Sequence, residues 1–234
     1  GIVGYNVQTA VDTKHHLIVA HEVTNDGSDR SQLSPMAKQA RVAMGVKDLS
    51  AVADRGYFKS EEIHACHEAG ITVFVPKVVT SGATAAGRFG REDFIYDNAT
   101  NEYQCPAGDR LIWRFSSIEK GLKMDCYWSS NCQSCYLKKD CTPSEQRRVK
   151  RWEHEAVLDA MQSSLDQAPE MMRIRKQTVE HPFGTLKAWM GATHFLTKTL
   201  PRVSTEMSLH VLAYNMKRVI KILGSKALME AMTA

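Results

Sequence analysis

Residues 51–76 read AVADRGYFKSEEIHACHEAGITVFVP and carry the clearest structural pattern of the chain. The letters AVAD predict a short apolar strand that ends at Asp54, and RGYFK predicts a tight loop after it. A helix is expected next, with Ser60 as its cap, two glutamates in its first turn and Gly70 at its end. ITVFVP predicts a second apolar strand. Strand, helix and strand form a βαβ unit, in which the two strands lie parallel in one sheet.

The segments on either side of this unit extend the prediction. Residues 5–24 alternate apolar and polar side chains around the turn DTKHH, which predicts a β-hairpin, and residues 33–44 predict a helix. Residues 78–101 are expected to form a loop or linker. The Cys-rich residues 102–145 show neither a clear helical nor a clear strand period.

The last third of the chain is predicted to be helical. A helical region begins near Glu153 and resumes after Pro169, and a final helix is expected from about Ser204 to Leu223. Pro182 is compatible with an unbroken helix only near the start of that helix. The apolar stripe of the final helix is expected to lie in the core or to cover the sheet, and it consists of Leu209, Leu212, Met216, Val219, Ile220 and Leu223.

Composition places the chain among globular proteins with a mild positive charge. Its 234 residues are 43% hydrophobic and 24% charged, and no apolar run reaches the roughly 20 residues of a membrane span. A net charge of +4 permits a nucleic-acid partner without requiring one. We therefore expect no membrane contact and a cytoplasmic location. Because the sequence opens at Gly1 directly with a strand pattern, we expect a fragment of a longer reading frame.

Two short motifs contain the acidic residues of interest. Asp54 lies at the carboxyl end of its strand, where open α/β sheets hold their ligands, although an aspartate there is also a common helix cap. Glu180 lies in VEHPFGTLK, shortly after the basic residues Arg173, Arg175 and Lys176. A glutamate on a helix is usually a solvated charge, but the basic residues before it indicate a phosphate-rich partner.

Taken jointly, these motifs resemble those of DDE-type transposases of bacterial insertion sequences. The hairpin GYNVQTAVD…HLIVAHEVTNDGSDRSQL is similar to the strands before the family's second acid, ADRGY to the second-acid motif, and VEHPFGTLKAWMG to the third-acid motif. CPAG followed by C-x2-C resembles the family's cysteine insertion. The resemblance covers nearly the whole chain. It implies an α/β fold: an RNase H-like mixed sheet with flanking helices and an inserted Cys-rich segment.

The resemblance also implies a division of the chain and an activity. Residues 1–77 would form the first part of the catalytic core without its first strand, residues 78–152 a linker and Cys-rich insertion, and residues 153–234 the helical completion of the core. The implied activity is metal-dependent DNA strand cleavage and strand transfer by in-line phosphoryl transfer. Three carboxylates would hold two Mg²⁺ (or Mn²⁺) ions. The implied partners are element ends and target DNA, with a homodimer allowed and a nucleoid-associated location.

Residue by residue, Asp54 matches the second acid and Glu180 the third. Lys187 lies seven positions after Glu180, where the related signature has a lysine that contacts DNA phosphate. The signature's arginine, four residues before the glutamate, is Lys176 here, and its tyrosine, three residues earlier, is Arg173. These two departures put the detailed DNA contacts in doubt, but not the match of Glu180 to the third acid.

The first acid of the resembling family has no clear match. Asp12 is the one early candidate, but it falls in the hairpin turn, where aspartate is a favoured residue. Asp26 and Asp29 are expected to shape a turn and to cap the next helix. If the first acid is missing, the chain as given lacks a metal ligand and is expected not to cleave DNA.

The six cysteines suggest a second metal. Cys132, Cys135, Cys141 and the upstream Cys105 could give a tetrahedral Zn²⁺ site with four thiolate ligands, or they could remain reduced, partly buried thiols; Cys126 is an alternative ligand. Cys66 falls inside the predicted helix and is expected to be a core residue.

Two other functions remain open at this stage. One is an RNase H-like nuclease without strand transfer, and the other is a non-catalytic remnant that binds nucleic acid through the basic, zinc-ribbon-like insertion. Among aromatic and histidine residues, Tyr57 and Phe183 are expected to pack around the site. His15 and His16 are expected to be solvated, and His181 either has a structural role or touches water or phosphate at the site.

Overall fold

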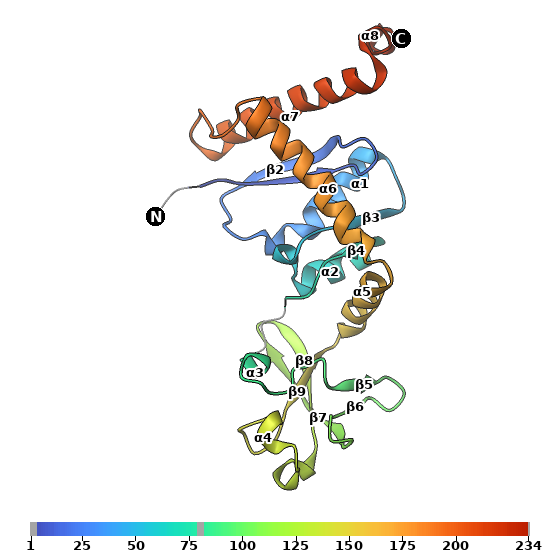
Figure 1. Ribbon diagram of the computed structural model, residues 1–234, viewed down its shortest axis with the longest axis vertical. Coiled ribbons are helices and arrows are strands. Elements are labelled where there is room, and N and C mark those ends of the chain that lie inside the picture. The colour runs from blue at the N-terminus through green and yellow to red at the C-terminus, as the bar shows by residue number, and fades with distance from the viewer. Residues whose placement is uncertain (1–3, 79–81, 234) are drawn as a thin grey trace. The chain divides into compact units, whose positions relative to one another are not determined.

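The computed structural model describes residues 4–78 and 82–233. Contacts divide the chain into two units, of which the first comprises Gly1–Lys77 and Val157–Ala234 and the second Val78–Ala156. Both units combine helices with β-sheet, and Figure 1 labels their elements. The fold is therefore mixed α/β, in agreement with the fold class expected from the sequence.

The first unit opens with the predicted hairpin. Strand β1 (Asn6–Val11) pairs antiparallel with β2 (Ile18–Thr24), with an irregularity in register between Ala10 and Val11. A 3₁₀ turn follows at Asp29–Ser31, and helix α1 (Leu33–Met44) then has the bounds that the sequence predicts. Gly45 ends α1 with a φ of 62°, a backbone conformation that glycine adopts without strain.

The βαβ unit is confirmed. Strand β3 (Leu49–Val52) lies parallel to β4 (Ile71–Phe74), and α2 (Ser60–Glu68) connects them. The expected cap at Ser60 is wrong: Lys59 precedes the helix, and the structure shows no side-chain cap bond there. Cys66 is fully buried, as expected of a core residue.

Four α-helices complete the chain after the insertion. They are α5 (Glu155–Gln167), α6 (Glu170–Gly184), α7 (Leu200–Leu223) and α8 (Ser225–Thr233), with a π-helical turn at Thr185–Trp189 directly after α6. The break after α5 falls at Pro169, as predicted. Pro182, however, lies near the end of α6 and not near its start. Its missing N–H removes one helix bond close to the C-terminus, where few further bonds depend on it.

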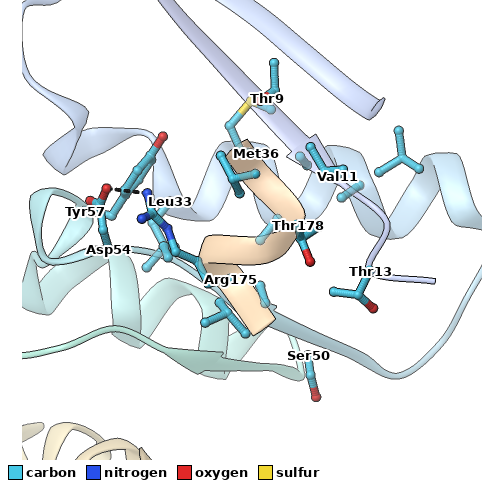
Figure 2. A pocket seen from close by; sticks show the side chains of 18 of the residues that line it. Thr9, Val11, Thr13, Leu33, Met36, Ser50, Asp54, Tyr57, Arg175 and Thr178 are labelled. Atoms are coloured by element: carbon cyan, nitrogen blue, oxygen red, sulfur yellow. Dashed lines mark hydrogen bonds and ion pairs between the residues drawn. The ribbon is translucent and has the colours of Figure 1, made fainter. Parts of the chain in front are cut away.

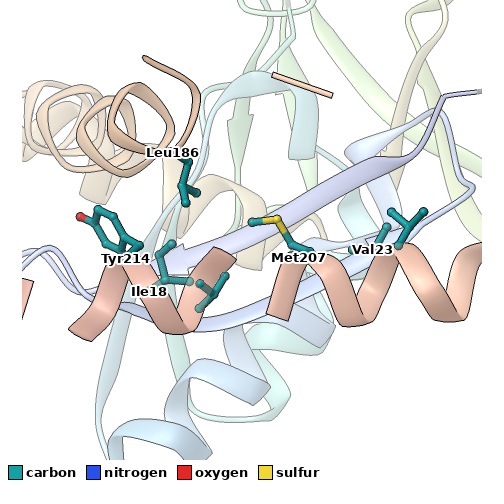
Figure 3. Packing of buried hydrophobic residues seen from close by; sticks show 7 residues of the cluster. Ile18, Val23, Leu186, Met207 and Tyr214 are labelled. Atoms are coloured by element: carbon teal, nitrogen blue, oxygen red, sulfur yellow. The ribbon is translucent and has the colours of Figure 1, made fainter. Parts of the chain in front are cut away.

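The buried face of α7 differs from the predicted stripe. Val203, Met207, Val211 and Tyr214 are buried against Ile18, Val23 and Leu186 (Figure 3), whereas the predicted stripe residues Leu209, Leu212, Met216, Ile220 and Leu223 are exposed. Hydrogen bonds from α7 to the hairpin fix which face of α7 is buried. Asn215 Oδ1 accepts from the N–H of Ile18 at 2.9 Å, and Asn215 Nδ2 donates to the carbonyl of Ile18 at 2.8 Å. Arg218 donates to the carbonyl of His15. Apolar periodicity alone does not contain this information.

The second unit contains a five-stranded antiparallel sheet that the sequence did not predict. Its strands follow in chain order: β5 (Ile95–Asp97), β6 (Glu102–Gln104), β7 (Arg110–Glu119), β8 (Leu122–Trp128) and β9 (Val149–Trp152). Helix α3 (Gly82–Ala85) precedes the sheet, and the segment between β8 and β9 forms a 3₁₀ helix (Ser130–Ser134) and α4 (Lys138–Cys141). The core is small, with Phe94, Tyr103, Leu111, Tyr127 and Val149. Several apolar side chains of β7 are exposed, so apolar and polar residues do not alternate regularly along this strand.

Candidate active site around Asp54

Asp54 lies two residues beyond the end of β3 and caps a 3₁₀ turn (Arg55–Tyr57). Its Oδ1 accepts a hydrogen bond from the backbone N–H of Gly56 at 2.9 Å. A Cβ atom at position 56 would come within 2.9 Å of the same oxygen, closer than real contacts allow. The glycine of ADRGY therefore lets the backbone approach the carboxylate, which holds Asp54 in one orientation.

Arg175 of α6 binds the other oxygen of this carboxylate. Its Nη2 donates to Asp54 Oδ2 at 2.6 Å, and the two residues are 121 positions apart in the sequence. Figure 2 shows this ion pair beside Tyr57 at the edge of a cavity. The side chains of Arg175 and Asp54 are 26% and 39% exposed, so water and ions reach the pair. The arginine thus places a positive charge directly on the predicted catalytic carboxylate.

A second carboxylate, that of Asp29, lies close to Asp54. Asp29 Oδ1 accepts hydrogen bonds from the amide groups of Asn6 and Gln8, at 2.7 and 2.6 Å. Gln8 is buried and accepts a hydrogen bond from the hydroxyl of Tyr57. Burial, followed by the charges of Asp29 and Asp54, raises the pKa of Tyr57 to about 12. The phenol therefore stays neutral at physiological pH and serves as a hydrogen-bond donor within this network.

The cavity next to these groups has a volume of about 260 Å³ and lies within the first unit. Elements β1, α1, β3 and α6 line it, and Asp29, Asp54 and Arg175 supply its charged side chains. Most of the remaining lining is apolar, including Val7, Leu33, Met36, Ala51, Ile174 and Phe183. Tyr57 and Phe183 both belong to this lining, as expected.

Glu180 lies outside this cavity. Thr178 and Val179 line the cavity, whereas Glu180 is exposed on another side of α6. Arg173 and Lys176 are exposed on the same helix. The structure therefore brings α6 to Asp54, but it does not bring the Glu180 carboxylate into the cavity with it.

Lys187 follows α6 in the π-helical turn and is also exposed. Its Nζ lies 5.9 Å from the centre of the Phe183 ring. A second cavity of about 340 Å³, with Tyr5, Leu186 and His210 in its lining, lies beside this lysine. The π-helical turn changes the angular spacing after Gly184, so Glu180 and Lys187 do not lie on one regular helical face.

The residues around Asp54 suit a cation, although they do not form a ready metal site. Asp54 is accessible and already neutralises a cationic group, the Arg175 guanidinium. Carboxylate oxygen is also the ligand type that Mg²⁺ prefers. Across residues 4–78 and 82–233, however, no group of three His, Cys, Asp or Glu side chains could hold a metal ion as the side chains stand.

Sequence reasoning assigned Asp29 to a turn and did not single out Arg175. Position 175 lies four residues before Val179, so helical spacing could have placed Arg175 on the face of α6 that lines the cavity.

The carboxylate of Asp12 accepts hydrogen bonds from the backbone N–H groups of Lys14 and His15, at 3.3 and 2.6 Å, which is the expected turn geometry.

His16 and His181 lie together, away from the Asp54 cavity. Their ring centres are 5.3 Å apart, and Tyr214 bonds both His181 Nδ1, at 3.0 Å, and the carbonyl of His16, at 2.6 Å. His15 and His16, which were expected to be solvated, are both half-buried, and the Nδ1 atom of His16 is buried. Burial, with the nearby cations and His16, lowers the pKa of His181.

The four predicted zinc ligands Cys105, Cys132, Cys135 and Cys141 all line a cavity of about 30 Å³ in the second unit. Cys126, the alternative ligand, is buried in β8 and does not belong to that lining.

In the part of the chain that the structure describes, none of the helices has the length and the apolar composition of a membrane span.

Comparison with known proteins identifies a family. A family model described as "Transposase DDE domain" matches residues 1–216, which is most of the chain. No curated protein and no solved structure matches the chain. The family implies an enzyme that acts on DNA in transposition. The match includes both acidic motifs and the insertion between them, and the chain therefore belongs to the DDE-domain transposases.

Proposed function

We propose that the chain is the catalytic part of a DNA transposase that cleaves element ends and joins the freed 3′-hydroxyl to target DNA by in-line phosphoryl transfer. The observation that supports this most directly is the position of Asp54. It follows β3, stands at the edge of a cavity, and is held by a cation from α6, the helix that contains the third acidic motif. Asp54 would serve as the second acid and Glu180 as the third.

We further propose that the first unit is an RNase H-like core interrupted by residues 78–152. Strands β1 and β3 belong to two separate two-stranded sheets, and each has one strand partner among the described residues. Both strands line the same cavity. In such a core the two sheets would be parts of one mixed sheet. Asp12 does not fill the role of the first acid, because its carboxylate is used in the hairpin turn.

Metal-binding roles follow from this assignment. Asp54 and Glu180 would hold Mg²⁺ (or Mn²⁺), which supplies an activated oxygen nucleophile and stabilises charge on the leaving oxygen. The chain's own residues position these ligands: the Gly56 N–H fixes the rotamer of Asp54, and Tyr57 donates to the neighbouring Gln8. Arg175 neutralises Asp54 and would be free to contact phosphate once a metal ion replaces it.

The proposal requires α6 to turn. Successive residues of an α-helix are separated by roughly 100° around its axis, so a rotation of about that size would exchange Val179 for Glu180 at the cavity. Two features near the end of α6 make such a movement reasonable. Pro182 removes a backbone donor, and a π-helical turn, a feature frequent at functional sites, follows at Thr185–Trp189. The Arg175–Asp54 ion pair then opposes the rotation until a metal ion binds.

The proposal is tested by Mn²⁺ titration of the chain in a calorimeter. Asp54→Asn removes the charge but keeps an oxygen for the Gly56 N–H, so it should abolish binding while leaving the local backbone in place. Glu180→Gln should weaken binding as well. Asp12→Asn is the matched control: it also removes one carboxylate charge, keeps a turn acceptor, and should leave binding unchanged. Equal Mn²⁺ affinity in the parent chain and Asp54→Asn would refute the assignment.

A second candidate function, nucleic-acid binding without catalysis, is favoured by one surface of the second unit. Arg114 and Arg148 each lie 5.3 Å from the Trp128 ring centre, and Trp113 and Phe115 are exposed on the same strand pair. Exposed aromatic rings beside cations suit single-stranded nucleic acid. DNA binding without metal binding, unaffected by Asp54→Asn, would support this candidate. Metal-dependent nicking without joining would instead indicate a nuclease that lacks strand transfer.

A further inference from the structure

Four of the six cysteines converge in the second unit. Cys105, Cys132, Cys135 and Cys141 are free thiols that line one small cavity, whose volume is about 30 Å³. They come from three segments: the turn after β6, the 3₁₀ helix with the residue after it, and the end of α4. Their convergence is therefore a property of the fold and does not follow from sequence proximity alone.

Backbone hydrogen bonds fix each of these segments. The carbonyl of Cys105 accepts from Gly108 N–H at 2.8 Å, and Cys105 N–H donates to Asp109 at 2.9 Å. Gly108 has a φ of 81°, so the turn after Cys105 depends on a glycine. Cys132 and Cys135 are joined by a bond from the N–H of Cys135 to the carbonyl of Cys132. The thiols are thus presented by ordered turns.

The four thiols share the lining of this one cavity, and no disulfide joins them. Four cysteine sulfur atoms around one small cavity provide the soft ligands that Zn²⁺ prefers.

Arg147 provides a second and independent indication of a ligand. It lines the same cavity, and its Nε is buried without a hydrogen-bond partner, while its Nη2 donates to the carbonyl of Phe89 at 3.2 Å. An unpaired buried N–H is unfavourable unless an acceptor is supplied. A divalent ion with four thiolates has a net charge of −2 by the formal charges of its parts, and its sulfur atoms accept hydrogen bonds. Such a group would complement the charge and the free N–H of Arg147.

We propose that Cys105, Cys132, Cys135 and Cys141 bind one Zn²⁺ ion as a closed, four-ligand structural site. Among residues 4–78 and 82–233 the thiols as they stand do not form a ligating group, so binding requires them to turn inward. The sulfur atom of each cysteine turns about a single bond, χ1. The ion would link three segments of a unit whose apolar core is small. This site does not depend on the proposed transposase activity, because thiolate ligands select Zn²⁺ and not Mg²⁺.

The test is the metal content of the full chain, purified under reducing conditions from cells supplied with zinc. We expect about one zinc ion per chain, the stoichiometry of a single tetrahedral site. Cys132→Ser and Cys141→Ser should each lose most of this zinc. Cys126→Ala is the matched control, because this thiol lies in the same unit but outside the cavity, and it should keep the full content.

Cobalt substitution protects the test against misfolding of the serine variants. The parent chain, stripped with a chelator and loaded with Co²⁺, should show thiolate-to-cobalt charge-transfer absorption and the intense visible bands of tetrahedral cobalt. Zinc should displace the cobalt and remove these bands. A folded parent chain that contains no zinc and gives no such spectrum would overturn the proposal. Disulfides between these cysteines that persist in the chain freshly purified under reducing conditions would also overturn it. The same holds if Cys126→Ala loses as much zinc as Cys132→Ser.

Discussion

Arg175 is expected to compete with metal ions for Asp54, so Arg175→Gln should strengthen metal binding. The ion pair has a short contact of 2.6 Å, but its side chains are 26% and 39% exposed. A pair this accessible is worth about 1 kcal/mol, since water screens the charges and ordering two long side chains is unfavourable. Because about 1.4 kcal/mol corresponds to a factor of ten in affinity, loss of this competitor should tighten Mn²⁺ binding roughly fivefold.

Calorimetric titration of Mn²⁺ at low ionic strength measures this change. Arg173→Gln is the matched control, because it removes the same charge from an exposed position on the same helix. A general change in net charge would alter both variants equally, whereas competition at Asp54 alters only Arg175→Gln. The gain should also disappear in the double variant Asp54→Asn/Arg175→Gln. Unchanged or weaker affinity in Arg175→Gln would refute the competition and, with it, the view that the arginine stands where a metal ion binds.

Two further predictions concern stability. Since the pKa of Tyr57 is raised from 10.0 to about 12, the folded chain keeps a proton that the unfolded chain loses in this range, and the free energy of unfolding should fall as pH rises from 10 to 12. In chemical unfolding at a series of pH values, Tyr57→Phe should show a shallower fall; parallel curves would contradict the assigned cause. Val203→Ala, at a fully buried position of α7, should lower the unfolding free energy by about 2 kcal/mol, whereas Leu209→Ala, 62% exposed, should change it by about 0.5 kcal/mol at most. Equal losses would contradict the observed face of α7.

Most of the first unit could be predicted from the sequence because its elements have strong local signals. The hairpin, α1 and the βαβ unit depend on alternation, helical period and glycine positions, which are properties of adjacent residues. The buried face of α7 could not be predicted, because both of its faces offer apolar residues. The choice between them depends on polar side chains such as Asn215, which bond a strand about 200 positions away.

The second unit and the site could be predicted only in part, for the same reason. The sheet of the second unit has exposed apolar side chains and a small aromatic core, so its strands lack a regular period. At the site, the sequence pointed to Asp54 and α6 but not to the partners that a carboxylate acquires on folding. Asp29 resembles a turn residue, and Arg175 one of several cations, until the fold places both beside Asp54.

The separation of Asp54 and Arg175 by 121 positions has a consequence for the newborn chain. During synthesis the hairpin and the βαβ unit leave the ribosome before Val78–Ala156, and the whole of this segment must follow before α6 exists. Until then Asp54 lacks the ion pair with Arg175, and β3 lacks its contact with α6. Closing a loop of this length carries a modest entropic penalty that grows only slowly with length, but it delays the closing contact in time. The site that we propose for DNA cleavage therefore lacks this contact until α6 has been synthesised.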